Sequence, residues 1–458
     1  MNTSTTNTRR SFLRNASLAA GAVSIVPSHL RGQGPTPANN KLNIAGIGVG
    51  GMGATNLSHC ETENIVALCD VDPNLAAKTF AKYPQARQYK NYREMLDKEK
   101  NIDAVIIATP DHTHAVIAMA CMKAGKHVYV QKPLAHAVWE ARLMTETARK
   151  CKVSTQMGNQ GHSGEGLRLI SEWVAAGVLG DVKEVHAWTN RPVWPQGIEV
   201  ERPKDTPAVP PGMDWNEWIG PAPMRPFHPE YHPQKWRAWW DFGTGSLGDL
   251  GCHILDPVFA ALKLKYPSSV EGCISTYWEG FWKKTEPKNE TYPRSTIVRY
   301  QFPGRENMAP VALTWWDGGL MPPRPAELDP GRKMGDDDGG VLLIGSKATL
   351  MAGCYGRGPR LIPDAKMKEF TPPAKTLERI PQGEGGHEQD WIRSCKDGKH
   401  ASSHFDYSGP LSEMVLMGNL AVRFPNRQLL WDGEKMAVTN DPEANAYVRR
   451  QYREGWSL

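Results

Sequence analysis

Two short segments of this chain carry side chains that can exchange protons with a bound molecule. Lys132 follows an apolar run that predicts a strand, and it therefore lies at the edge where open α/β sheets bind ligands. Asp249 and His253 are four residues apart, and Asp256 follows three residues later. If residues 248–256 are helical, these three side chains share one face. Taken alone, the Asp–His pair is typical of a helix surface; together with Lys132 it favours catalysis.

A glycine-rich turn, Gly48-Val49-Gly50-Gly51-Met52-Gly53, follows a predicted strand and opens a predicted helix. In that context the glycines allow a tight turn and a close approach to a pyrophosphate, which then faces the N-terminus of the helix. Asp70 ends the next predicted strand. Its carboxylate can accept from a ribose hydroxyl and would repel a 2′-phosphate, so the sequence favours NAD over NADP.

The elements that carry these segments alternate between short strands and helices over residues 41–160. Buried parallel strands are expected at Asn43 to Ile47, Ile65 to Cys69, Ala104 to Ala108, Val128 to Val130 and Val153 to Met157. Asp72 followed by Pro73 predicts a helix start, and Gly125 predicts the end of a helix that begins near Thr113. This alternation predicts a Rossmann dinucleotide-binding domain.

The pattern changes beyond residue 160. A helix is expected at Gly164 to Ala176, followed by strands without regular helices between them, at Val182 to Thr189, Val270 to Trp278, Ser295 to Phe302, Val311 to Trp316 and Val341 to Ile344. We therefore predict a second, α+β domain over residues 161–458, with an open, mostly antiparallel sheet and a late helix near Leu411 to Arg423. Eleven prolines between Pro192 and Pro233 predict an extended arm or lid over residues 192–233 rather than regular structure.

With these motifs in place, the chain resembles the Gfo/Idh/MocA family, the glucose-fructose oxidoreductase and inositol dehydrogenase group, over most of residues 41–458. The matching motifs are Gly48-x-Gly50-x-x-Gly53, Asp70, the loop Thr109-Pro110-Asp111-His112-Thr113-His114, Lys132-Pro133 and Asp249-x-Gly251-x-His253-x-x-Asp256. The resemblance implies that NAD contacts Gly51, Met52, Thr109, Pro110, His114 and Lys132, and that the chain forms a homo-oligomer. Gln131 stands where the family usually has Glu, so a negative charge beside Lys132 is lost.

Oxidation of a secondary alcohol requires a group that accepts the hydroxyl proton while hydride leaves carbon for a nicotinamide. His253 is the candidate base, and Lys132 is the candidate that polarises the reacting oxygen. Asp249 either orients His253 or holds a substrate hydroxyl. Gly251 is expected to leave this face open for a flat ring or a sugar.

We therefore expect an NAD-dependent oxidoreductase that acts on a ring hydroxyl or keto group of a sugar, glycoside or cyclic polyol. One alternative is an NAD-dependent glycosidase, which oxidises a glycoside transiently and eliminates its aglycone. The other alternative is a non-catalytic binding protein that retains NAD.

Further polar and aromatic residues are candidates for substrate contact. His162 lies at the expected interdomain cleft, where a substrate contact and an interface hydrogen bond are equally compatible with the sequence. Of the 16 Trp residues, 11 lie between Trp188 and Trp316, and Trp236 and Trp239 directly precede the Asp249 segment. Their rings suit the face of a sugar and also suit a core. The pair His112 and His114 has no third ligand at a matching spacing, and the eight Cys residues show no zinc pattern, so no metal site is expected.

The N-terminal segment Thr8-Arg9-Arg10-Ser11-Phe12-Leu13-Arg14 precedes an apolar run from Ala16 to Val26 and resembles a twin-arginine signal. Because that route exports folded proteins, the export machinery is an expected partner, the expected location is periplasmic or otherwise exported, and NAD is expected to travel with the protein. The apolar run is too short to span ~30 Å of hydrocarbon. Beyond residues 1–40, which hold four Arg and no acid, the chain carries 50 basic and 49 acidic residues, so its charge gives no reason to expect nucleic acid as a partner.

Overall fold

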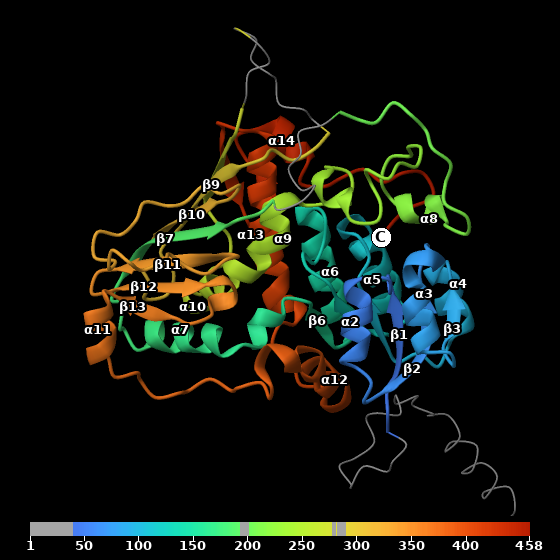
Figure 1. The fold of residues 1–458 in the computed structure, drawn as a ribbon, viewed down its shortest axis with the longest axis horizontal. Helices are drawn as coiled ribbons and strands as arrows, with labels where there is room; N and C mark the ends of the chain where they lie inside the picture. The colour runs from blue at the N-terminus through green and yellow to red at the C-terminus, as the bar shows by residue number, and fades with distance from the viewer. Residues whose placement is uncertain (1–39, 193–200, 277–280, 282–289) are drawn as a thin grey trace, which may run out of the picture. The chain divides into compact units, whose positions relative to one another are not determined.

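The computed structural model describes residues 40–192, 201–276, 281 and 290–458. Residues 42–458 form one compact unit that contains two β-sheets (Figure 1). The segment that resembles an export signal and residues 193–200 of the proline-rich stretch lie outside the described residues. No helix in the described ranges combines the length and the apolar character needed to cross a bilayer.

The first sheet has six parallel strands in the order β3-β2-β1-β4-β5-β6. Their bounds are β1 Asn43–Ile47, β2 Asn64–Cys69, β3 Arg87–Tyr89, β4 Ala104–Ile107, β5 His127–Val130 and β6 Thr155–Met157. This is the strand order of a doubly wound Rossmann domain, so the expected fold of this region is confirmed. β3 was not predicted, because its three residues form no apolar run.

Helices cover both faces of the first sheet, and its core therefore has two halves. The helices within this region are α2 Met52–Ser58, α3 Pro73–Lys82, α4 Tyr92–Lys98, α5 His114–Lys123 and α6 Val138–Cys151. Successive residues of β1 point to opposite faces. Ile44 and Leu57 of α2 belong to one cluster of buried residues, whereas Ile47 and Met144 of α6 belong to another. A helix from much later in the chain, α12 (His387–Asp397), closes the first face with Trp391.

The second sheet has nine strands in the order β13-β12-β11-β7-β10-β9-β8-β14-β15. Their bounds are β7 Val182–Thr189, β8 Ser269–Ile274, β9 Thr296–Phe302, β10 Val311–Trp316, β11 Gly339–Gly345, β12 Thr349–Gly353, β13 Arg360–Ile362, β14 Gln428–Asp432 and β15 Ala437–Val438. Only the pair β7 and β10 is parallel among the described strand pairs of this sheet. The expected, mostly antiparallel sheet is therefore confirmed.

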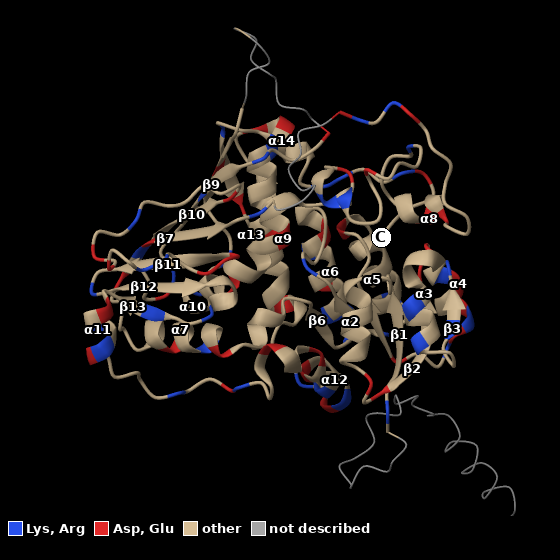
Figure 2. Cartoon of the chain, viewed as in Figure 1, with Lys and Arg blue, Asp and Glu red and all other residues tan. Residues whose placement is uncertain are grey.

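The remaining helices lie outside the Rossmann region, and some of them carry part of the candidate site. They are α7 Glu165–Ala175, α8 Trp215–Ile219, α9 Gly245–Ile254, α10 Asp256–Ala261, α11 Asp364–Glu369, α13 Phe405–Arg423 and α14 Pro442–Ala446. α13 contacts α6, α9 and β8, and so ties the two sheets together (Figure 1). Figure 2 shows that α4, α11 and α12 each carry both basic and acidic side chains.

Most described residues of the proline-rich stretch have no regular structure, as its composition predicts, but the stretch also contains a short helix and packed aromatic side chains. Among its described residues, Trp215–Ile219 form helix α8. Trp215, Trp218, Phe227, Tyr231, Trp236, Trp239 and Phe242 form a buried aromatic cluster. Hydrogen bonds attach this segment to the first sheet, from the Asp214 amide to the Val71 carbonyl (2.8 Å) and between His232 and Asp72 (2.8 Å). Burial of so many rings gives the segment a core of its own despite its prolines.

Trp239 belongs to this cluster, which corrects the expectation that it contacts substrate. The side chain is 1% exposed, and its indole N–H donates to the Glu230 carbonyl (2.8 Å). We expect Trp239→Ala to lower the free energy of unfolding by about 3–5 kcal/mol, as is usual for a buried aromatic residue. Denaturant unfolding of Trp239→Ala beside Trp239→Phe measures this. An unchanged unfolding midpoint together with a lost sugar affinity would restore the substrate role.

Candidate active site

A cavity of about 350 Å³ lies at the carboxyl ends of strands β1, β2, β4 and β5. This is the edge at which open α/β sheets bind ligands, and the volume suits a small molecule. Eleven of the residues predicted to form the site line it: Gly48, Gly50, Gly51, Met52, Asp70, Thr109, Pro110, His114, Lys132, Trp236 and Asp249. The structure thus brings the predicted cofactor loop and two of the three predicted catalytic residues into one cavity.

The glycine loop has the shape that a dinucleotide requires. Gly48 has a φ of +77°, which favours glycine, and a Cβ on Gly53 would lie 2.1 Å from the Gly48 carbonyl oxygen. A Cβ on Gly50 would lie 2.5 Å from Leu75, whereas one on Gly51 would meet nothing within 4 Å. The loop is therefore tight against the protein and open toward the cavity, and its residues fit NAD.

Asp70 connects the end of β2 to this loop. One carboxylate oxygen accepts hydrogen bonds from the amides of Val49 (2.8 Å) and Gly50 (3.1 Å), and the other accepts from the amide of Asp72 (3.0 Å). Burial raises the pKa of Asp70 to about 6, and the three amides only partly oppose this effect. The carboxylate is placed where a ribose hydroxyl is bound in Rossmann domains.

The raised pKa of Asp70 predicts that NAD affinity depends on pH. Below about pH 6 the free protein carries a proton on Asp70, and this proton must leave before the carboxylate can accept from the ribose. We expect the affinity of nucleotide-stripped protein for NAD to fall as the pH drops through this value, by up to about tenfold per pH unit. Calorimetric titration over a pH series measures this. Asp70→Asn should bind weakly with a flat profile, and an equally steep fall in that variant would assign the effect to another group.

Lys132 and Asp249 form an ion pair at the wall of the cavity. The Lys132 Nζ donates to Asp249 Oδ1 at 2.6 Å and to the Asp249 backbone carbonyl at 2.7 Å. Two further cations approach this carboxylate, since Arg191 Nε lies 3.8 Å and Arg237 Nε 4.0 Å from its oxygens. The structure gives Asp249 a contact that neither of its two expected roles includes, because its Oδ1 accepts a hydrogen bond from Lys132.

The Gln131 side chain is hydrogen-bonded although it carries no charge. Its Nε2 donates to Asn56 Oδ1 (2.9 Å), and the Asn56 amide in turn donates to Glu388 Oε1 (2.6 Å). Glu388 is 3% exposed and comes from α12. A carboxylate from a distant part of the chain therefore ends the network that begins beside Lys132, and the sequence motifs did not predict it.

His253 lies in α9, one turn after Asp249, and is 4% exposed. Burial first, and then the positive charge of Lys132, lower the pKa of His253 well below its usual value. The imidazole is therefore neutral at rest, and one of its ring nitrogens carries a lone pair. Its Nδ1 is buried and has no hydrogen-bond partner among the described residues.

The helix expected over residues 248–256 is interrupted between His253 and Asp256, which corrects the prediction of one continuous helix. α9 ends at Ile254, and α10 begins at Asp256 with Pro257 in its first turn, because proline disfavours helical continuation from the preceding residues. Asp256 is instead buried with His162, whose Nδ1 lies 3.0 Å from Oδ1. Asp256 also accepts from Tyr407 (2.5 Å). Of the two alternatives for His162, the structure therefore supports the interface hydrogen bond.

Gly251 does not face open space, contrary to expectation. A Cβ at this position would lie 3.0 Å from Val415 of α13 and 3.0 Å from Leu247. The glycine therefore permits close packing of α9 on α13.

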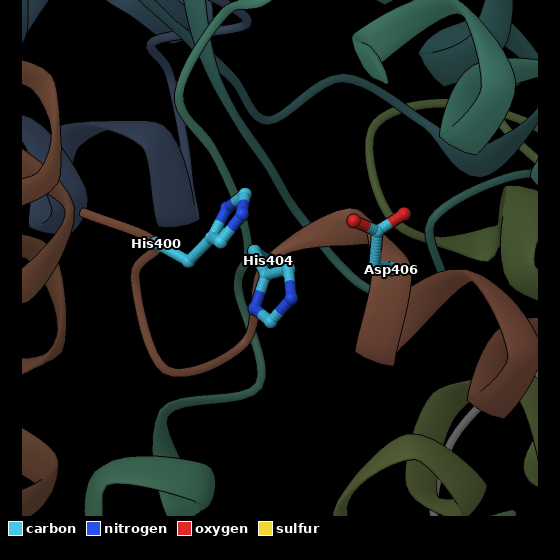
Figure 3. Close-up of side chains that lie close together, drawn as sticks. All are labelled: His400, His404 and Asp406. Carbon is cyan, nitrogen blue, oxygen red and sulfur yellow. The ribbon is translucent and has the colours of Figure 1, made fainter. Parts of the chain in front are cut away.

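His112 and His114, the pair considered as metal ligands, lie within hydrogen-bond distance of backbone carbonyls. His112 Nε2 lies 3.0 Å from the Trp218 carbonyl, and both ring nitrogens of His114 lie within hydrogen-bond distance of backbone carbonyls. Elsewhere in the described residues, His400, His404 and Asp406 have possible ligand atoms within 4.8 Å of one another (Figure 3). There the Arg149 guanidinium already forms an ion pair with Asp406, and the two imidazoles stack at 4.4 Å. This group carries no metal assignment.

A Rossmann domain whose glycine loop shares a cavity with a Lys–Asp pair defines a dinucleotide-dependent oxidoreductase. Residues 42–159 match a family model described as "Oxidoreductase family, NAD-binding Rossmann fold", and residues 170–275 match "Oxidoreductase family, C-terminal alpha/beta domain". The chain belongs to the Gfo/Idh/MocA family of oxidoreductases, and NAD is the cofactor of its first domain.

The individual curated relatives have low sequence identity to this chain. The chain is 29% identical over 202 residues to a "Glycosyl hydrolase family 109 protein" of Shewanella pealeana, covering 38% of this chain and 44% of that protein. It is 27% identical over 141 residues to "Myo-inositol 2-dehydrogenase" of Thermotoga maritima, covering 31% and 42%. The matched region thus spans less than half of the length of these curated relatives. The solved structure of the WlbA dehydrogenase from Bordetella pertussis, with NADH and UDP-GlcNAcA, shares the fold with a TM-score of 0.58 at 16% identity, covering 86% of this chain and 99% of that one.

Proposed function

We propose that this protein is an exported enzyme that uses tightly bound, internally recycled NAD to oxidise or reduce a ring hydroxyl or keto group of a sugar, glycoside or cyclic polyol. The observation that carries the proposal is that Lys132 and Asp249 lie in the same cavity as the dinucleotide loop. The relatives that act on inositol and on glycosides support a carbohydrate or polyol substrate.

In this proposal Lys132, His253 and Asp249 have different roles in the reaction. NAD, when bound, takes up or returns the hydride of the reacting carbon. Lys132, held by Asp249, donates a hydrogen bond to the reacting oxygen and stabilises negative charge that develops there. His253, neutral because it is buried beside Lys132, accepts the hydroxyl proton. Asp249 is the positioning residue that fixes the Lys132 ammonium.

The second candidate is glycosidase chemistry, which the glycosyl hydrolase family 109 relative favours. Both candidates begin with oxidation of a ring hydroxyl, but only the glycosidase eliminates an aglycone and then reduces the product. Incubating the NAD-loaded protein with aryl glycosides separates them. We expect reduced nicotinamide to accumulate without release of the aryl alcohol. Release of the aryl alcohol with no net change in the nicotinamide would select the glycosidase.

Export is proposed from the N-terminal sequence alone. We expect replacing Arg9 and Arg10 together by Lys to retain the full-length protein in the cytoplasm, because the twin-arginine pathway reads this pair. Cell fractionation with an antibody against the protein measures the distribution, and Arg31→Lys serves as the matched control. Unchanged export of the double variant would show that the pair is not the signal.

A further inference from the structure

His253 lacks the hydrogen bond that ordinarily orients a proton-transferring histidine. In such residues one ring nitrogen exchanges the proton, and a hydrogen bond to the other fixes the ring. Here Nδ1 is buried and has no hydrogen-bond partner among the described residues. The orientation of this imidazole must therefore come from packing or from a hydrogen bond to Nε2. A hydrogen bond to Nε2 would occupy the nitrogen that is left to exchange the proton.

Tyr355 supplies a specific packing contact. The centroids of the Tyr355 and His253 rings lie 4.6 Å apart, and their planes are inclined by 86°. This edge-to-face arrangement is the favourable geometry for two aromatic rings and restricts rotation of both. Tyr355 is half-buried, whereas His253 is buried.

The backbone holds Tyr355 in this place at a conformational cost. Tyr355 has φ 60° and ψ 14°, a left-handed conformation that bulky residues rarely adopt and that is found where the surrounding structure requires it. It fits closely against Gly161, since a Cβ on that glycine would lie 2.8 Å from the Tyr355 Cβ. Gly161 directly precedes His162, in the segment that joins the two sheets.

A cation on the Tyr355 ring completes the arrangement. The Arg357 guanidinium lies 4.5 Å from the ring centroid, and Arg357 Nε donates to Glu384 Oε1 at 2.9 Å. The ring is thus held by its backbone, by close packing on Gly161 and by an anchored guanidinium.

We propose that Tyr355 is a positioning residue whose ring fixes the plane of the His253 imidazole and shields it from water. This role rests on the proposed function, because it assigns to Tyr355 the orientation of the base of that reaction. The ring performs it, and the phenol hydroxyl is not required.

Three substitutions test the proposal on the NAD-loaded full chain. Tyr355→Asn and Tyr355→Gly remove the ring and suit the left-handed backbone, so both are expected to fold; Tyr355→Phe keeps the ring. In the ringless variants we expect kcat to fall roughly tenfold to a hundredfold with KM little changed, as for a misplaced catalytic group. Tyr355→Phe should retain most of the activity. Loss of activity in Tyr355→Phe equal to that in Tyr355→Asn would overturn the assignment to the ring.

The pH dependence of kcat/KM gives a second test. It would not change if Tyr355 only stabilised the fold. The charged and titratable groups that act on His253 are Lys132 after β5, Asp249 on the same helix, His387 of α12 and Arg191 after β7, and all are retained in the variants. Admitting water should raise the pKa of His253 toward its usual value. The low-pH limb of kcat/KM should therefore move to higher pH in Tyr355→Asn and Tyr355→Gly but not in Tyr355→Phe. An unmoved limb in all three variants would contradict the proposal.

A substrate-free measurement separates failure of this proposal from failure of the proposed function. Diethylpyrocarbonate acylates accessible neutral imidazoles, and mass spectrometry locates the modified residue. We expect His253 to react several-fold faster in Tyr355→Asn than in the wild type or Tyr355→Phe. If the wild type oxidises no sugar but this pattern appears, the proposed function fails and the positioning of His253 stands. Equal reactivity in all variants would overturn the positioning.

Discussion

Replacing Lys132 by Met is expected to lower kcat by roughly 10²–10³-fold while leaving NAD bound. The ammonium is a preorganised donor at the cavity wall, and loss of one such donor to a developing negative charge has this size of effect. Met keeps most of the side-chain volume, but it leaves Asp249 without the 2.6 Å ion pair that holds it. Steady-state kinetics and the nucleotide released on denaturation measure both parts of the prediction.

The control for this variant is Lys123→Met, an exposed lysine of α5. It should have unchanged kinetics. Wild-type turnover in Lys132→Met would remove Lys132 from the chemistry and, with it, the observation that carries the proposed function. Loss of bound NAD instead of turnover would assign Lys132 to cofactor binding alone.

Replacing His253 by Ala is expected to lower kcat by roughly 10²–10⁴-fold, the range for loss of a general base. Because the imidazole is buried, its removal leaves a space that added imidazole can enter. Partial recovery of turnover by imidazole, with NAD content unchanged, would identify proton transfer as the lost step. His400→Ala, which removes an exposed histidine, is the control. Undiminished turnover in His253→Ala would exclude this residue as the base.

The Rossmann half was largely predictable because its strands are short, apolar and bounded by turn residues. The predicted strand Asn43 to Ile47 coincides with β1, and Asp72 caps α3 by accepting from the Asn74 amide (3.0 Å). The second sheet was predicted in part. β13 and β15 were missed because they have only three and two residues, and β14 because it pairs with the distant strand β8. β12 was also missed.

The candidate site was predictable where a residue's position follows from a strand end. Lys132 and the glycine loop lie at the same sheet edge, and the structure places them in one cavity. The continuous helix expected through Asp256 was wrong because Pro257 lies in the first turn of a second helix, α10. Trp239 was misassigned because a tryptophan that lines a cavity and one in a core have the same sequence signal. Tyr355 was missed because nothing in the sequence indicates that a tyrosine adopts a left-handed backbone conformation at this position.

The hydrogen-bond network from Gln131 through Asn56 to Glu388 could not be predicted without the folded structure. These residues come from β5, α2 and α12, and Glu388 approaches only because α12 returns to the first sheet. The Asn56 amide thus links the Gln131 amide to the carboxylate of Glu388. No spacing rule connects residues 131 and 388.

The most direct test of the central claim is the nicotinamide absorbance of the purified protein, recorded without added nucleotide while sugars, glycosides and cyclic polyols are supplied one at a time. If NAD is tightly held and accepts hydride at this site, reduced nicotinamide should appear with at least one of these compounds and disappear when a keto sugar is added as acceptor. A protein that is purified without nucleotide and turns over only with added NAD would contradict the claim.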